Sequence, residues 1–309
     1  MRALWLAAPG VPELREAPDP EPGPGEVRVR TLHSGISRGT EALVFRGGVP
    51  RAQAAEMRAP FQEGEFPGPV KYGYLNVGEL EDGQVVFCLY PHQDVYAVPA
   101  SAVVPVPADV PPGRAVLAGT VETAVNALWD GAPRVGDRIA VVGGGMVGCC
   151  VAALLSGIPG VSVELVDPLD RSAVLAPWGV PCVADPAGER DLVFHTSGTS
   201  AGLTRSLELL GTEGEVVEMS WYGDTPVTVP LGAGFHPRRL TIRSSQVGMV
   251  APARRARWTF RDRVSLALRL LADPRFDAVI TDAVAFAELP ARLPEILGEP
   301  SGLCVRVDY

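Results

Sequence analysis

The pattern of hydrophobic and polar positions changes partway along the chain. In the first third, apolar residues alternate with polar ones at residues 27–31, and this period of two predicts a half-buried β-strand. Short, mostly apolar runs at residues 84–90 and 94–98 predict further strands. The stretch from Pro18 to Gly25 holds so many prolines that it cannot be helical. A second proline-rich passage, Pro105 to Pro112, ends this β-rich region.

Beyond that passage, helical and strand patterns alternate. Helices are predicted over residues 115–129, 146–155, 202–210 and 258–271, and strands over residues 138–142, 161–166, 191–194 and 215–219. Strands that alternate with helices indicate a parallel sheet with right-handed crossovers. We therefore predict an α/β fold, in which a doubly wound parallel sheet follows a β-rich unit.

The turn after residues 138–142 carries the most specific motif. It reads Gly143-Gly144-Gly145-Met146-Val147-Gly148, a G-x-G-x-x-G sequence between a predicted strand and an apolar helix. In that setting Gly143 makes the tight turn, Gly145 lets a pyrophosphate approach the backbone, and Gly148 lets helix and strand pack closely. The helix start at Met146 and Val147 offers free amides to the phosphates. The sequence predicts a dinucleotide-binding Rossmann unit.

Two residues near the end of the next strand bear on which dinucleotide binds. Asp167 stands at the spacing where a carboxylate accepts hydrogen bonds from the adenosine ribose. It would repel a 2′-phosphate by about 4 kcal/mol at about 4 Å and an effective dielectric of about 20. We therefore expect NAD. Arg171 leaves NADP open, because an arginine there can pair with a 2′-phosphate, although it can equally cover the adenine or form a surface ion pair.

Composition and charge narrow the class of partner. The net charge of −9 argues against nucleic acid or an anionic membrane as the main partner, so we expect a small-molecule substrate. The five cysteines show no C-x-x-C spacing, which argues against a structural zinc site and is typical of a reducing cytosol. We find no apolar run of about 18 residues and no signal peptide, and we expect a cytoplasmic protein.

Several segments together resemble one enzyme superfamily. They are Glu26–Val29, Ser34–Glu41, Gly73–Gly78 and Glu122–Ala124, followed by the glycine motif. Over nearly its full length the chain resembles the medium-chain dehydrogenases/reductases. The resemblance implies a β-rich, chaperonin-10-like (GroES-like) catalytic domain over residues 1–118, a Rossmann domain over residues 119–249, and a C-terminal segment over residues 250–309 that returns to the catalytic domain. It also implies a homodimer.

Within the superfamily, the chain looks most like the zinc-free branch that includes bacteriochlorophyllide hydroxyethyl dehydrogenases. Where zinc-dependent members carry their ligands, this chain has Ser37, Tyr74 and a position near Gly119. A catalytic zinc ion needs three protein ligands of the N, S or O type, and we judge that these three residues cannot supply them. We therefore expect no zinc.

Without a metal, hydrogen-bond donors must stabilise the oxygen that gains charge during hydride transfer. Tyr74 is the first candidate, and the alternative is that it merely fills the former metal site. Lys71, the only lysine, would lower the pKa of Tyr74 or donate directly if a turn at Gly73 brought them together. Ser37 and Thr40 are further hydroxyls that the family layout places near the nicotinamide.

Three more residues follow from the family layout. Glu122 is a candidate base or orienting group, or else it serves the backbone. Thr123 would lie against the nicotinamide. Ser197 belongs to the turn Phe194–Gly198, which would line the cofactor.

We expect an oxidoreductase that transfers hydride between NAD(H) and an alcohol or ketone on a small or medium organic substrate, in specialised metabolism. Reduction of an activated C=C or C=N bond is the first alternative, and a non-catalytic cofactor-binding protein is the second. The absence of a G-x-S-x-G sequence argues against an acyl-transfer triad.

Overall fold

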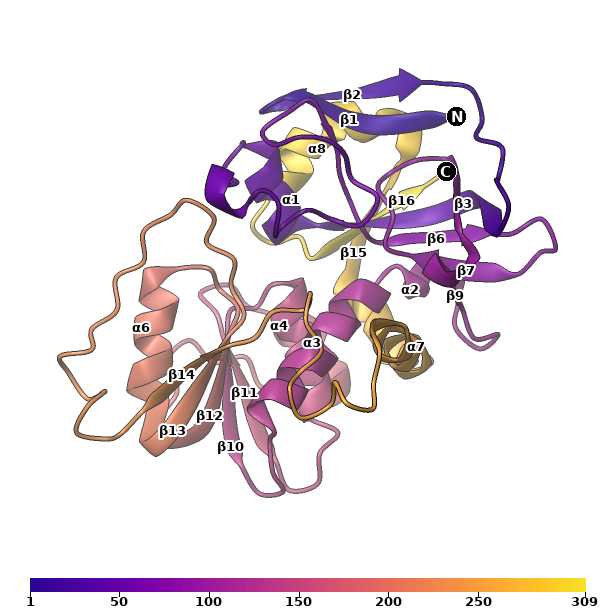
Figure 1. Cartoon of the computed structure of the whole chain (residues 1–309). Helices are drawn as coiled ribbons and strands as arrows, with labels where there is room; N and C mark the ends of the chain where they lie inside the picture. The colour runs from indigo at the N-terminus through magenta and orange to yellow at the C-terminus, as the bar shows by residue number, and fades with distance from the viewer. The chain divides into compact units, whose positions relative to one another are not determined.

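The computed structural model describes all residues from Met1 to Tyr309, and the chain divides into two compact units (Figure 1). The first unit comprises Met1–Gly119 together with Val264–Tyr309, and the second comprises Thr120–Arg263. The first unit is therefore discontinuous in sequence. The end of the chain completes a domain that its beginning started.

The first unit is built mainly of β-strands. Its strands are β1 (Arg2–Ala8), β2 (Val11–Glu16), β3 (Glu26–Ser37), β4 (Glu63–Gly64), β5 (Val70–Lys71), β6 (Asn76–Glu79), β7 (Val85–Cys88), β8 (Val95–Pro99), β9 (Val104–Pro105), β15 (Ile280–Ala285) and β16 (Cys304–Asp308). Its helices are α1 (Arg38–Phe45), α2 (Pro112–Ala115) and α8 (Leu289–Gly298). The β-rich character predicted for the first third is confirmed. The chaperonin-10-like assignment of this unit stays a prediction.

Two sheets form the first unit. One has the order β2-β1-β5-β4, and the other has the order β15-β16-β3-β6-β7-β9, with β8 also paired to β3. The C-terminal strand β16 pairs antiparallel with β3, so that Cys304 lies opposite Ser37 and Asp308 lies opposite His33. The end of the chain is thus hydrogen-bonded to the strand that leads into Ser37.

The second unit alternates strands and helices. Its elements are α3 (Ala118–Gly131), β10 (Arg138–Val142), α4 (Met146–Leu155), β11 (Ser162–Val166), α5 (Ser172–Leu175), β12 (Arg190–His195), α6 (Ser200–Leu209), β13 (Leu210–Glu218) and β14 (Thr241–Ser244). The sheet has the order β11-β10-β12-β13-β14, and every pairing is parallel. The predicted parallel α/β sheet is confirmed. The order reverses direction beside β10, which creates a topological switch point between β10 and β12.

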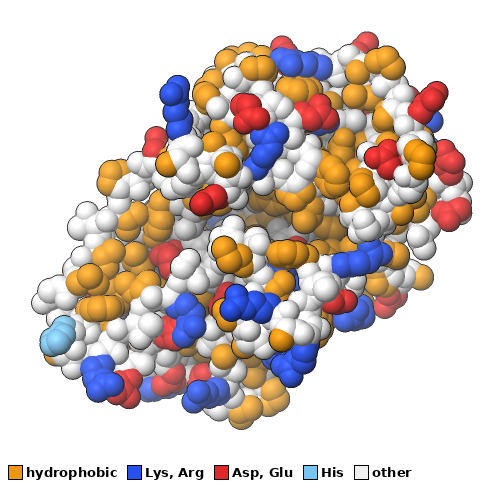
Figure 2. Space-filling view, in the orientation of Figure 1, with side chains coloured by type: hydrophobic (Ala, Val, Ile, Leu, Met, Phe, Trp, Pro, Cys, Tyr) orange, Lys and Arg blue, Asp and Glu red, His pale blue; other side chains and the backbone are white.

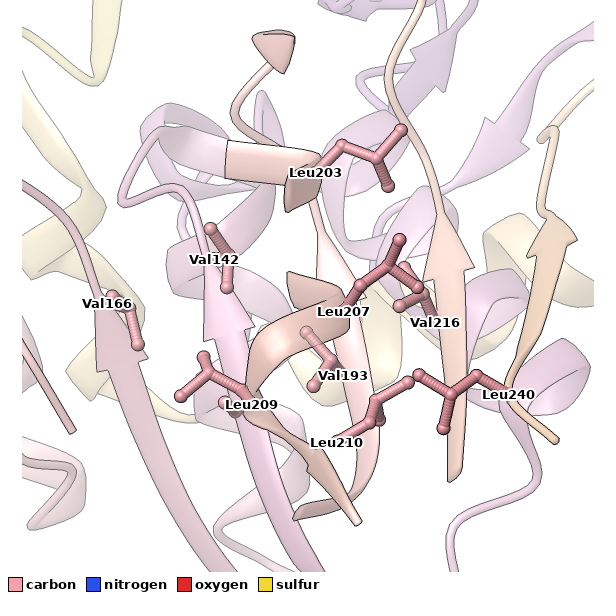
Figure 3. Packing of buried hydrophobic residues seen from close by; sticks show 10 residues of the cluster. Val142, Val166, Val193, Leu203, Leu207, Leu209, Leu210, Val216 and Leu240 are labelled. Atoms are coloured by element: carbon pink, nitrogen blue, oxygen red, sulfur yellow. The ribbon is translucent and has the colours of Figure 1, made fainter. Parts of the chain in front are cut away.

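Helices cover both faces of this sheet because successive side chains of a strand point to opposite sides. On one face, Leu203 and Leu207 of α6 pack onto a core that includes Val142, Val193 and Val216 (Figure 3). On the other face, a Cβ at Gly131 of α3 would lie 2.9 Å from Val217 and 3.0 Å from Phe194. Each face of the sheet is buried, which explains why its strands read as continuous apolar runs.

One predicted boundary needs correction. Residues 250–263 were expected to return to the first unit, but they belong to the second. Their contacts with α3 give the reason: the backbone amide of Ala251 donates to Asn126 at 3.0 Å, and the Trp258 ring lies 5.0 Å from that of Trp129. The return begins only within α7 (Phe260–Leu270), at Val264.

Candidate functional site

The glycine turn has the geometry that the motif predicts. Gly143 follows β10 with φ +113°, in the region that favours glycine. A Cβ there would lie 2.6 Å from the amide nitrogen of Ser197, in the turn after β12. A Cβ at Gly148 would lie 1.9 Å from the carbonyl oxygen of Gly143. These two glycines bring the ends of β10, β12 and α4 together at the switch point.

Gly145 differs from Gly143 and Gly148, because no atom lies within 4 Å of the position that its Cβ would occupy. It precedes α4, whose first residues are Met146 and Val147. The amides of a helix start have no intrahelical acceptor and favour an anion. The open space above Gly145 therefore fits the pyrophosphate of a dinucleotide.

Asp167 lies directly after β11, and its carboxylate is hydrogen-bonded to the backbone of the glycine turn. Its Oδ2 accepts a hydrogen bond from the amide of Gly144 at 2.5 Å, and its Oδ1 accepts one from Leu169 at 2.8 Å. Each carboxylate oxygen has a second lone pair, so Asp167 can still accept from a ribose hydroxyl.

Arg171 is only 5% exposed, which excludes the surface ion pair considered for it. Its backbone amide contacts the sulfur of Cys182 at 3.4 Å, and a Cβ at Gly144 would lie 2.8 Å from its Cγ. Arg171 thus packs against the glycine turn from the side of Asp167.

In the first unit, the structure brings three of the predicted hydroxyl residues together. The partly buried side chain of Tyr74 is hydrogen-bonded to those of Ser37 and Thr40. Burial raises the pKa of Tyr74 to about 12, although these two hydrogen bonds act in the opposite direction. Tyr74 therefore stays protonated at neutral pH and can donate a proton.

Lys71 does not join this cluster, and the idea that it lowers the pKa of Tyr74 is corrected. Its ammonium group is buried and donates to Glu63 at 2.5 Å and to Gln93 at 2.6 Å, and it lies 5.3 Å from the centre of the Tyr90 ring. Although Gly73 between them has a φ of +123°, Lys71 and Tyr74 keep different hydrogen-bond partners. Burial lowers the pKa of Lys71, while Glu63 partly restores it.

A buried chain of hydrogen bonds lies behind the cluster and begins at Glu41, which the family layout offers as a possible base or orienting group. The carboxylate of Glu41 accepts from the amide of Ser37 at 2.7 Å and contacts His92 Nε2 at 3.0 Å. His92 Nδ1 lies 2.7 Å from the hydroxyl of Ser34, which lies 3.0 Å from that of Tyr309. Glu41 lies four residues after Ser37, which precedes α1 but makes no helix-capping hydrogen bond with its side chain. The role of Tyr309 depends on β16 pairing with β3.

Glu122 has a structural partner. Its carboxylate accepts from Arg263 Nε at 2.9 Å, and Arg263 is completely buried. Arg263 also donates to the backbone carbonyls of Val247 and Met249. Burial raises the pKa of Glu122, whereas Arg263 opposes this shift. The pair joins the first turn of α7 to α3, and it is Arg263 that bonds the backbone carbonyls of the preceding loop. The surroundings of Glu122 therefore favour a structural role. Thr123 follows it on α3 and is half-buried.

The three positions that the resemblance compares with zinc ligands lie in different surroundings. Ser37 and Tyr74 are adjacent, but a Cβ at Gly119 would lie 2.5 Å from Leu75, among apolar side chains. No three His, Cys, Asp or Glu side chains gather into a group that could hold a metal ion. Ser37, Tyr74 and Gly119 therefore do not form a set of three ligands in this structure.

Comparisons with known proteins give a clear result for the fold. No family model and no curated protein matches the chain. Three solved structures align with 100% of this chain and 99% of their own: an alcohol dehydrogenase from Escherichia coli CFT073 with NADH (TM-score 0.79, 17% identity), a putative zinc-binding dehydrogenase from Clostridium scindens (0.80, 16%), and the Haloferax mediterranei glucose dehydrogenase with NADP, Zn and gluconolactone (0.75, 16%). The chain has the fold of these dehydrogenases.

These structural neighbours overturn the prediction about zinc. The expectation of a cofactor set without zinc is contradicted, because the neighbours include a zinc-binding dehydrogenase and one with zinc bound. The bound NADH and NADP of the neighbours agree with the predicted nicotinamide dinucleotide. No helix of the chain has both the length and the apolar character that crossing a membrane requires.

Proposed function

We propose that the protein is an NAD(P)-dependent oxidoreductase of the medium-chain type, which interconverts an alcohol and a carbonyl compound. One observation carries the proposal: the turn at Gly143–Gly148 is tightly packed at both ends and open at Gly145, at the switch point of a parallel sheet. Solved dehydrogenases with this fold along their whole length support it.

The residues of the second unit would bind and orient the dinucleotide. The helix start at Met146 and Val147 offers amides to the phosphates, and Asp167 offers a carboxylate oxygen to the adenosine ribose. When bound, the nicotinamide supplies or accepts the hydride. The negative charge of Asp167 favours NAD over NADP, which has a 2′-phosphate at that ribose.

The first unit would supply the proton. Reduction of a carbonyl leaves charge on its oxygen, and Tyr74 can donate a proton there because burial keeps its pKa high. Ser37 and Thr40 hold the phenol in place. Glu41 fixes Ser37 through its backbone amide, so it acts as a positioning residue.

The test is a fluorescence titration with NADH and, separately, with NADPH. We expect tighter binding of NADH, and we expect Asp167→Ser to reduce that preference by about tenfold or more, roughly 1.4 kcal/mol. Asp170→Asn is the matched control, since Asp170 is exposed three residues further on. Preference of the wild type for NADPH would overturn the role of Asp167, and binding of neither would overturn the proposed function.

A further inference from the structure

A serine, a histidine and a carboxylate stand in a row in the second unit. His195 ends β12, Glu218 ends β13, and the register of the two parallel strands pairs them. His195 Nδ1 lies 2.7 Å from Glu218 Oε2, and its Nε2 lies 2.7 Å from Ser197 Oγ. Both contacts fall within hydrogen-bond distance. A nucleophile, a base and an orienting carboxylate in this order form the arrangement that activates serine in acyl transfer.

The surroundings of His195 and Glu218 determine which atoms of the two side chains carry protons. His195 is completely buried. Glu218 also accepts from the amide of Ser220 at 2.7 Å and from the hydroxyl of Tyr222 at 3.0 Å. Burial by itself would raise the pKa of Glu218, but the hydrogen bonds from His195 and Ser220 bring it below its ordinary value. An ionised Glu218 holds the proton on Nδ1, which leaves Nε2 to accept the proton of Ser197.

Ser197 itself lies in the turn between β12 and α6. A serine at a strand–turn–helix junction, at the carboxyl end of a parallel sheet, is the setting of the nucleophile in α/β-hydrolases. A Cβ at Gly202 would lie 2.0 Å from Ser197 Oγ, so the hydroxyl rests against the first turn of α6. The amide of Gly202 already donates to the Thr199 hydroxyl at 3.0 Å, so the amides of Ser200 and Ala201, which have no intrahelical acceptor, would stabilise an oxyanion.

We propose that Ser197 is an activated nucleophile and that it gives this chain a second activity, the hydrolysis of activated carboxylic esters. Ser197 Oγ attacks the carbonyl carbon while its proton passes to His195 Nε2. The C–O bond of the ester breaks, and the leaving alcohol takes that proton. Water then attacks the acyl-serine, gives its proton to Nε2, and Ser197 regains it as the carboxylic acid leaves. No oxidant or reductant takes part.

This reaction transfers no hydride and does not use Tyr74, which belongs to the first unit, although Ser197 lies in the turn after β12 that is also expected to line the cofactor. The sequence argument against an acyl-transfer triad relied on the missing G-x-S-x-G sequence. The structure supplies the three side chains by another route, since Glu218 comes from the neighbouring strand.

The test measures p-nitrophenyl acetate hydrolysis by the full-length protein without added cofactor. We expect hydrolysis that saturates with ester concentration and falls by about 100-fold or more in Ser197→Ala. Glu218→Gln should lower it by about tenfold or more, because the histidine loses its orienting charge. Ser162→Ala, an exposed serine at the start of β11, is the matched control and should hydrolyse like the wild type.

A second measurement needs no variant. A fluorophosphonate probe should lose fluoride and form a covalent bond to Ser197 of the wild-type protein, and peptide mapping by mass spectrometry locates the adduct. Hydrolysis that persists in Ser197→Ala, or a wild type without an adduct at Ser197, overturns the proposal. Neither result touches the NADH titration, so the two proposed activities fail separately.

Discussion

At the scale of single residues, burial determines which side chains can exchange a proton. Tyr74 shares a cluster with Ser37 and Thr40, and its raised pKa keeps it protonated. Lys71 is more deeply buried, and its ammonium group donates to Glu63 and Gln93. The same kind of environment thus leaves one residue available as an acid and makes the other a structural cation.

The role of Tyr74 leads to a prediction about its hydroxyl. We expect Tyr74→Phe to lower the turnover number for ketone reduction by about 100-fold, because a general acid contributes roughly that much, while NADH affinity stays unchanged. Steady-state kinetics and the fluorescence titration measure the two effects. Tyr72→Phe is the control. The ring of Tyr72 packs edge to face against that of Tyr74, with 6.1 Å between the ring centroids, but its hydroxyl is not bonded to Ser37 or Thr40. Normal turnover in Tyr74→Phe would favour reduction of a C=C or C=N bond.

At the scale of elements, the ends of strands and helices concentrate the chemistry. The carboxyl ends of β10, β11, β12 and β13 carry the glycine turn, Asp167, His195 and Glu218. The connection from β13 to β14 contains no helix, and its Phe235 packs against the sheet core. On the face drawn in Figure 2, side chains of Lys and Arg lie among those of Asp and Glu.

Two glycines of one turn should respond differently to the same substitution. Gly145→Ala meets no atom within 4 Å and has a φ of −74°, so we expect an unchanged melting temperature and a dinucleotide affinity at least about tenfold weaker. Gly148→Ala would collide with the Gly143 carbonyl, and we expect it to lower the melting temperature as well.

Thermal melts followed by circular dichroism, together with the NADH titration, separate the two cases. If Gly145→Ala bound NADH like the wild type, the space above this residue would not be the pyrophosphate site. If Gly148→Ala melted like the wild type, the close contact between α4 and β10 would have been accommodated by the backbone.

At the scale of the whole molecule, every one of the six tyrosines has a raised pKa, and burial is the largest cause each time. Unfolded tyrosines lose their protons near pH 10. Between that pH and the higher folded-state values, the folded chain binds more protons than the unfolded chain. The free energy of unfolding therefore falls as the pH rises above about 10.

This gives a prediction for alkaline titration. Phenolate absorbance should stay low in the native protein near pH 10 and then increase together with the loss of circular dichroism. The chain in concentrated urea should titrate near pH 10 throughout. Extensive phenolate formation near pH 10 with an intact dichroism spectrum would contradict the burial of these side chains.

The sequence by itself determined the periodic parts of this protein. The alternation of residues 27–31, the apolar strands at 138–142 and 161–166, and the glycine motif each predicted a local element that the structure contains. These features depend on residues close together in the chain, where period and turn chemistry act directly. The glycine turn after residues 138–142 could be predicted because its glycines are contiguous.

Tertiary structure alone decided the contacts between distant segments. The pairing of β16 with β3 brings Tyr309 to Ser34. Residues 250–263 pack on α3 through Arg263. The register of β12 with β13 places Glu218 beside His195. The partners in each case come from different strands or helices, so no local period indicates them. Which buried polar groups meet depends on how strands pair, and pairing is a property of the whole fold.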